Sequence, residues 1–316
     1  MTDTRKGVLA LVSACIAWGL SSIFYKALVG VDPAEVLAHR TLWSLFFFAG
    51  VLLVQGRISA LWHAVSHRAS LKIIVLAAVM ISSNWFLFIW SIHSGRATEA
   101  SLGYYIFPLV AVVFGRLMFG ERLSNLQWVA VGLAVAAVLT LTVGLRIVPW
   151  IPLGLAASFG LYGVLKKRLD LGPVVSVTAE VFLLSPLALG WLLMLHLGQG
   201  GAFGDDLRQS LLLCASGVVT GAPLILFAYG ARRLAMSTVG LLQYINPTLQ
   251  FVVAVAIFGE PFSTIHLAAF SLIWTALALY SSSAVRQDKA RRRARMVSEA
   301  EVAVSSSSSS EASAKP

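Results

Sequence analysis

The stretch YIFP at residues 105–108, separated by ten residues from FGE at 119–121, recurs later in the chain as YINP at 244–247 and FGE at 258–260. The offset between the two copies is 139 residues for both motifs. Over the 27 residues from 98 to 124, nine are identical to their counterparts at that offset. Self-similarity at a fixed offset is typical of internal duplication. The sequence therefore predicts two halves of the same fold.

The composition is that of a membrane protein. Of 316 residues, 58% are hydrophobic and only 12% are charged, about half the charged share of a soluble domain. The mean hydropathy is +0.82. A soluble domain of this size could not bury so much apolar surface and keep a wettable exterior. This excludes a soluble enzyme or nucleic-acid-binding domain for the bulk of the chain.

The hydropathy pattern predicts an all-α polytopic membrane protein with ten transmembrane helices, because a span needs roughly 20 apolar residues. The expected domains are a five-helix half over 1–145, a second over 146–284 and a tail over 285–316. The predicted spans are 7–27, 36–54, 71–91, 100–119, 126–143, 147–165, 174–195, 210–229, 237–258 and 265–283.

Five helices per half is an odd number, so the two halves are predicted to insert with opposite orientation. Inverted repeats of this kind are a common architecture of secondary transporters. With the N-terminus in the cytoplasm, 19 Lys and Arg residues lie inside and 5 outside. This bias fits the positive-inside rule with both termini in the cytoplasm. We therefore expect a multi-pass protein of the inner (plasma) membrane.

The predicted C-terminal tail differs in composition from the rest of the chain. It begins with a basic run at 286–295 and continues with a serine tract at 305–310. This composition cannot form a packed core, so the tail is expected to be disordered. We expect the basic run to lie against anionic lipid, which makes membrane lipids partners. The net charge of +10 is spread over loops and tail, so no nucleic-acid partner is predicted.

Three further motifs, together with the repeat, carry a resemblance to a known family. They are E-x3-HR-x2-WS at 35–44, NW-x3-IW at 84–90 and SLGYY at 101–105. With the paired halves, they resemble the EamA domain of the drug/metabolite transporter superfamily, and more closely its RarD group of permeases, over residues 5–285. The resemblance implies export of small molecules. Phe107 departs from the pattern, since an Asn is expected there as at Asn246.

Two charged residues at membrane depth are the first site candidates. Arg40 and Glu180 lie in the second span of each half, at an offset of 140 residues. An unpaired ionisable group costs about 3 kcal/mol there, so both are functional candidates by default. We predict that they converge at a central cavity, Arg40 binding an anionic or carbonyl group of the substrate and Glu180 a cation or proton. The alternatives are a fixed ion pair between the halves and two residues that reach the outer interface.

Six further residues are predicted to contact substrate. They sit beside the internal prolines or within the third span, where a freed carbonyl or a buried amide needs a partner. The alternative is hydrogen bonding between helices, or for the tryptophan a place in the interfacial belt. These six residues are Asn84, Trp85, Tyr105, Gln243, Tyr244 and Asn246.

The sequence contains no GxxxxGK[ST] loop and no His/Cys cluster with metal spacing. We therefore predict no cofactor, no metal site and no enzymatic activity. Glu121 and Glu260 follow Phe-Gly and are expected to cap helices. The predicted function is a secondary transporter that exports small metabolites or drugs by alternating access. A proton gradient, solute exchange or the solute's own gradient would drive it, which makes protons candidate coupling ions. The alternatives are a membrane-embedded enzyme, a lipid scramblase and a structural membrane protein.

Overall fold

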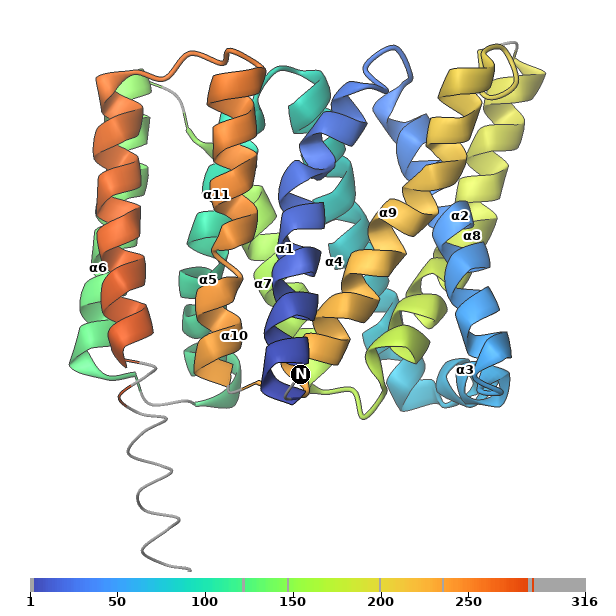
Figure 1. The fold of residues 1–316 in the computed structure, drawn as a ribbon, viewed down its shortest axis with the longest axis horizontal. Helices are drawn as coiled ribbons and strands as arrows, with labels where there is room; N and C mark the ends of the chain where they lie inside the picture. The colour runs from blue at the N-terminus through green and yellow to red at the C-terminus, as the bar shows by residue number, and fades with distance from the viewer. Residues whose placement is uncertain are drawn as a thin grey trace, which may run out of the picture.

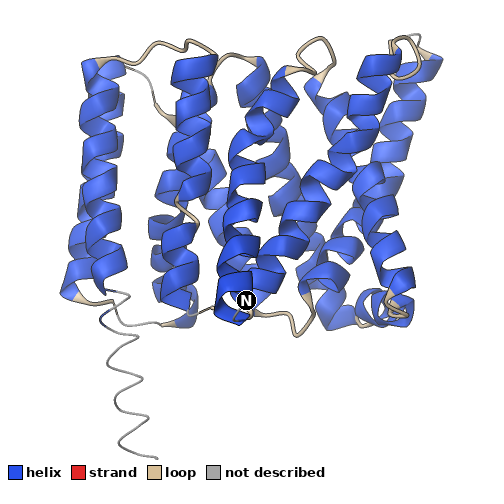
Figure 2. Cartoon of the chain, in the orientation of Figure 1, coloured by secondary structure: helices blue, strands red, loops and turns tan. Residues whose placement is uncertain are grey.

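The computed structural model describes residues 3–120, 123–146, 148–198, 200–234, 236–283 and 286. Within them all regular secondary structure is helical and no strand occurs (Figure 2). The prediction of an all-α protein is confirmed. Glu121 and residues 287–316, which include the serine tract, lie outside the described residues.

The helices follow one another up and down the bundle (Figure 1). In chain order they are α1 (Asp3–Lys26), α2 (Pro33–Val54), α3 (Ile58–Ser66), α4 (Arg68–His93), α5 (Ala97–Phe119), α6 (Asn125–Leu145), α7 (Trp150–Lys167), α8 (Pro173–Leu197), α9 (Leu207–Ala231), α10 (Met236–Leu242), α11 (Ile245–Val252), the π-helix η1 (Val253–Ile257) and a final helix, Thr264–Ser283.

Eight of the ten predicted spans form helices that are long and apolar enough to cross a membrane. They are α1, α2, α4, α5, α6, α8, α9 and the final helix. α7 falls short because its 18 residues end in Lys166 and Lys167. The ninth predicted span is broken into α10, α11 and η1. The short helix α3 was not predicted.

The packing interleaves the two halves of the sequence. α1 packs against α9, α2 against α8 and α9, and both α4 and α5 against α7. Each of these contacts joins a helix from before residue 146 to one from after it. The helices of one half therefore bury their apolar faces largely against helices of the other half.

Glycines allow two of these crossings to be close. A Cβ at Gly217 in α9 would lie 2.4 Å from the carbonyl oxygen of Trp43 in α2. A Cβ at Gly230 would lie 2.7 Å from the carbonyl oxygen of Gly7 in α1. Small residues at crossings let helix backbones approach, which is how helices associate where lipid weakens the hydrophobic drive.

The two ends of the bundle differ. The end at which α1 begins, here called the N-terminal end, also holds α3 and the end of the final helix (Figure 1). At the opposite end, buried apolar residues from several helices form a continuous cluster. Its members include Leu28, Val31, Val36, Ile89, Ile92 and Leu213.

Candidate functional site

A cavity of about 810 Å³ lies between the halves. This volume is within the range of about 300–1,000 Å³ typical of small-molecule sites. Its described lining comes from both halves. At the N-terminal end it includes Gln127, Lys167 and Ser281, which belong to the first or last turns of α6, α7 and the final helix. The cavity therefore extends to the N-terminal end of the bundle.

The cavity does not extend through the opposite end. There its described lining ends at Tyr25, Arg40 and Phe88. Tyr25 and Phe88 themselves belong to the apolar cluster, whose other members Leu28 and Ile92 are buried and do not line the described cavity. Arg40 is the eighth residue of α2, about 10 Å along the axis from the start of the helix. Arg40, at the deep end of the cavity, thus lies about two helical turns inside the bundle on that side.

Two glutamates tie segments together at this closed end. The Glu260 carboxylate accepts hydrogen bonds from the backbone N–H groups of Ala97 (2.6 Å) and Thr98 (2.7 Å) at the start of α5. Glu35 in α2 accepts from the N–H groups of Ala202 (2.8 Å) and Phe203 (3.3 Å) between α8 and α9. A carboxylate at a helix N-terminus also meets the positive end of the helix dipole. The capping role expected for Glu260 is confirmed.

Arg40 lines the deep end of the cavity. Its guanidinium carbon lies 4.1 Å from the ring centroid of Trp85 in α4 and 5.4 Å from that of Tyr25 in α1. Arg40 is only 7% exposed, and its buried Nε has no hydrogen-bond partner among the described residues. Cation–π contact with two rings offsets part of the cost of burying the charge. The aromatic contacts leave the hydrogen-bonding capacity of Nε unused.

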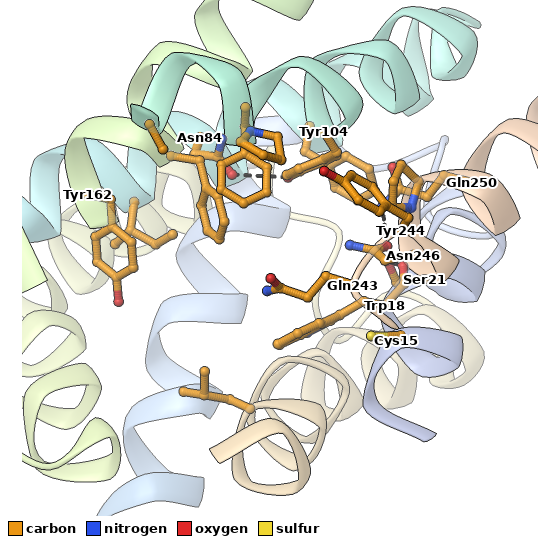
Figure 3. A pocket seen from close by; sticks show the side chains of 18 of the residues that line it. Cys15, Trp18, Ser21, Asn84, Tyr104, Tyr162, Gln243, Tyr244, Asn246 and Gln250 are labelled. Atoms are coloured by element: carbon orange, nitrogen blue, oxygen red, sulfur yellow. Dashed lines mark hydrogen bonds between the residues drawn. The ribbon is translucent and has the colours of Figure 1, made fainter. Parts of the chain in front are cut away.

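Asn84 connects three helices beside this wall. Its Nδ2 donates to the Leu155 carbonyl (3.0 Å) and to Ser158 Oγ (3.1 Å) in α7. Its Oδ1 accepts from the Tyr104 hydroxyl of α5 (3.0 Å; Figure 3). Asn84 therefore lines the cavity and at the same time serves as a hydrogen-bonded junction of α4, α5 and α7.

The broken helix supplies the other polar wall. Gln243 and Tyr244 occupy the break between α10 and α11, and Asn246 lies in the first turn of α11 (Figure 3). Gln250 Nε2 donates to Asn246 Oδ1 at 2.9 Å, while the buried Gln250 Oε1 has no partner within the described part of the chain. A helix break at membrane depth is tolerated where it lines a cavity.

Two of the predicted site residues lie outside the described cavity lining. Tyr105 is 2% exposed in an apolar cluster, and its hydroxyl lies 2.7 Å from Thr248 Oγ1. Glu180 is 1% exposed and forms an ion pair with Lys166, with Nζ and Oε1 2.6 Å apart. Its partner is therefore not Arg40, because the α7–α8 hairpin brings Lys166 onto the first turns of α8.

One tyrosine links Glu180 to the cavity. The Tyr162 hydroxyl donates to Glu180 Oε2 at 3.0 Å, and Tyr162 itself lines the cavity (Figure 3). Ser176 donates to Glu180 Oε1 at 3.1 Å and also accepts a hydrogen bond from Lys166. The sequence analysis missed Lys166 and Tyr162. Their position beside Glu180 depends on the hairpin, and no spacing rule in the sequence marks it.

Of the eight predicted residues, the structure brings six to one cavity. They are Arg40, Asn84, Trp85, Gln243, Tyr244 and Asn246. The lining contains several residues that the sequence analysis did not name, including Trp18, Gln127 and Lys167. Within the described ranges, no group of three or more His, Cys, Asp or Glu residues could hold a metal ion.

Comparison with known proteins gives a consistent family. The model of the EamA-like transporter family matches twice, over residues 5–143 and 147–282. The uncharacterized transporter YojE of Bacillus subtilis is 40% identical over 92% of this chain and 98% of its own length. Protein RarD of Streptomyces exfoliatus is 42% identical over 93% of both chains, and Protein RarD of Escherichia coli is 36% identical over 90% and 96%.

A solved crystal structure has the same fold. It superimposes with a TM-score of 0.57 over 90% of this chain and 99% of the other, at 20% sequence identity. At this identity the likeness concerns the arrangement of helices alone.

Proposed function

Because this chain belongs to the EamA-like transporter family, we propose that it is a secondary transporter that moves a small molecule across the inner membrane by alternating access. The chain is a multi-pass membrane protein, and relatives are named transporters. The observation that carries the proposal is the cavity between the halves, which reaches the N-terminal end and is closed at the other. A transporter in one of its two access states has this arrangement.

We propose ten transmembrane crossings, with both termini in the cytoplasm. α7 and the composite α10–α11–η1 run alongside the eight long apolar helices and supply the remaining two (Figure 1). In this topology the residues up to 145 and the residues from 146 to 284 form the two inverted halves. The cavity then faces the cytoplasm.

Substrate enters this cavity and contacts its deep wall. Arg40 and Trp85 form one side, and Gln243, Tyr244 and Asn246 the other. Asn84 positions the wall through its bonds to α5 and α7. Glu180 and Tyr105 support the site from behind, Glu180 through Tyr162 and Tyr105 through Thr248.

Opening to the opposite side requires the closed end to separate. In this proposal the Glu35 and Glu260 hydrogen bonds break, and the cluster that contains Leu28 and Ile92 parts. The break at Gln243 and Tyr244 absorbs the backbone change, since hinges are residues at element termini that take up large φ/ψ changes.

The test is a comparative profile of culture medium from cells that overproduce the protein. Val112 lines the cavity, whereas Val135 on α6 is 53% exposed on the outer surface of the bundle. Val112→Trp fills the cavity, and Val135→Trp is the matched control. We expect a solute to be enriched by the wild type and by Val135→Trp and not by Val112→Trp, at equal membrane levels. Transport would be refuted if the wild type changed no solute in either direction.

A further inference from the structure

We propose that the substrate is an organic anion with a flat apolar body, and that Arg40 is its counter-ion. This inference rests on the proposed function, since it names the class of solute that the same cavity takes. Four features of the cavity support it. They are the sign of its charges, the pairing of the nearby carboxylates with other groups, the lack of a counter-ion and of an Nε hydrogen bond at Arg40 among the described residues, and the aromatic walls.

The charged groups of the cavity are of one sign. Among the described lining residues, the side chains with a formal charge are Arg40 and Lys167, and none is Asp or Glu. A concave site with low-dielectric walls concentrates the field of such charges. The cavity therefore attracts anions and repels cations.

The glutamates of the described helices and loops are engaged elsewhere. Glu180 pairs with Lys166, and Glu99 pairs with Arg96 at 2.7 Å on the closed end. Glu35 and Glu260 bind backbone N–H groups at the same end. Within the part of the chain that the structure describes, no carboxylate forms an ion pair with Arg40.

Arg40 therefore has a requirement that the protein leaves unmet. A guanidinium is always protonated and presents five N–H donors. That of Arg40 is more than nine-tenths buried and borders the cavity, and its buried Nε has no partner in the described structure. A buried charge is stable only when paired. A carboxylate, phosphate or sulfonate of a solute satisfies both the charge and the donors.

The walls select the rest of the solute. Arg40 lies over the rings of Trp85 and Tyr25. From Tyr25 a series of edge-on ring contacts continues along the cavity lining through Phe88, Tyr104 and Phe159. Aromatic walls favour flat apolar groups through offset or edge-on contacts. A hydrated inorganic ion gains nothing from such walls. The combination matches an amphipathic organic anion.

The test measures binding to the purified full-length protein in lipid nanodiscs by isothermal titration calorimetry. Three probes share one flat ring system and differ in charge: 2-naphthoate, 2-naphthamide and 2-naphthylmethylammonium. The variants are Arg40→Gln and Arg40→Lys. Arg233→Gln is the matched control, because Arg233 also stacks on an aromatic ring, Tyr229 at 3.5 Å, but is exposed at the end of α9.

For the wild type and Arg233→Gln we expect naphthoate to bind at least about tenfold more tightly than naphthamide, and the amine most weakly, because a charge-assisted hydrogen bond in a dry site is worth this much. In Arg40→Gln, naphthoate and naphthamide should bind within about twofold of each other. Arg40→Lys should retain part of the preference, since it keeps the charge and loses the planar fork.

Three results would overturn the proposal. One is equal or tighter binding of the amide or amine by the wild type. Another is no binding of any probe at millimolar concentration. The third is binding of chloride or inorganic phosphate, each added alone as its sodium salt, that is as tight as the binding of naphthoate. That result would indicate a site for inorganic anions. Neutral or cationic solutes in the medium profile would also refute the anion class while leaving transport intact.

Discussion

At the residue scale, the energetics of Arg40 separate a functional role from a structural one. Burying an arginine at membrane depth costs about 3 kcal/mol. Its contacts with the Trp85 and Tyr25 rings return about 1–2 kcal/mol. A substrate-free protein should therefore gain stability when this charge is removed. Stability given up at a binding site is a common trade-off.

The first prediction follows from that balance. Arg40→Gln should leave the substrate-free protein as stable as the wild type or more stable by about 1 kcal/mol, while removing anion binding. The measurement is thermal unfolding in nanodiscs without ligand, with Arg233→Gln as control. A loss of stability of several kcal/mol in Arg40→Gln would show that Arg40 instead holds the helices together.

The second prediction concerns Glu180. Glu180→Gln leaves Lys166 without its counter-charge, and we expect a loss of about 2 kcal/mol. This is below the cost for a fully buried pair, because the Lys166 side chain is 22% exposed. The double change Glu180→Gln with Lys166→Met should recover most of the loss in a double-mutant cycle. If the effects of the two substitutions on stability simply added up, the loss in Glu180→Gln would not come from breaking the ion pair.

The sequence predicted that Arg40 and Glu180 meet at one cavity, and the structure places Arg40 there and Glu180 outside its described lining. Arg40 and Trp85 were named from depth and residue type, and both line the cavity. Their stacking could not be predicted, because it depends on how α2 and α4 lie side by side. Repeat symmetry suggested Arg40 as the partner of Glu180. Lys166 is nearer because consecutive helices of a hairpin meet whatever the symmetry.

At the element scale, the prolines of the two repeats lie in different surroundings, because only one of the two helices is broken. α5 continues through Pro108 from Ala97 to Phe119. In the second half the chain breaks at Gln243 and Tyr244, and Pro247 falls in the first turn of α11. A proline there removes an N–H that has no partner within the helix in any case. Sequence symmetry alone could not distinguish these outcomes.

The third prediction tests the crossing of α2 and α9. Gly217→Ala places a methyl group 2.4 Å from the backbone of Trp43, which cannot move as a side chain can. We expect a loss of about 2 kcal/mol or more in stability. The matched control is Gly190→Ala in α8, whose Cβ would meet open space. Its effect should be a gain of about 0.5–1 kcal/mol from helix propensity. Equal effects of the two changes on the unfolding temperature would contradict the close crossing.

The fourth prediction tests the carboxylate bonds at the closed end. Leu28 is fully buried in the apolar cluster there. In a variant with Cys15→Ala and Cys214→Ala, Leu28→Cys reports access of an impermeant thiol reagent from outside intact cells. Glu260→Ala and Glu35→Ala should each raise the labelling rate about tenfold, since each removes charge-assisted hydrogen bonds.

The matched control for that experiment is Glu99→Ala. Glu99 lies at the same end, but its carboxylate pairs with Arg96 and both side chains are partly exposed. It should leave the labelling rate of the Leu28 position near that of the parent. Labelling raised equally by all three substitutions would contradict a specific role for Glu35 and Glu260.

At the scale of the whole molecule, the halves interlock. The major contacts of α1, α2, α4 and α5 are with helices of the second half. Composition and hydropathy predicted the all-helical membrane fold, and the repeat predicted a cavity between halves. The interleaved packing was beyond the sequence, because side-chain patterns identify a buried face without naming the helix that covers it.

The measurement that tests alternating access most directly is a pair of spin-label distances in nanodiscs by double electron–electron resonance. One pair, Ser94→Cys with Arg208→Cys, spans the closed end. The other, Asp170→Cys with Arg232→Cys, spans the mouth of the cavity, and all four sites are exposed. When the medium-identified solute is added, we expect opposite changes: a longer population at the first pair and a shorter one at the second. If each pair gave one distance and the solute changed neither, alternating access would be contradicted.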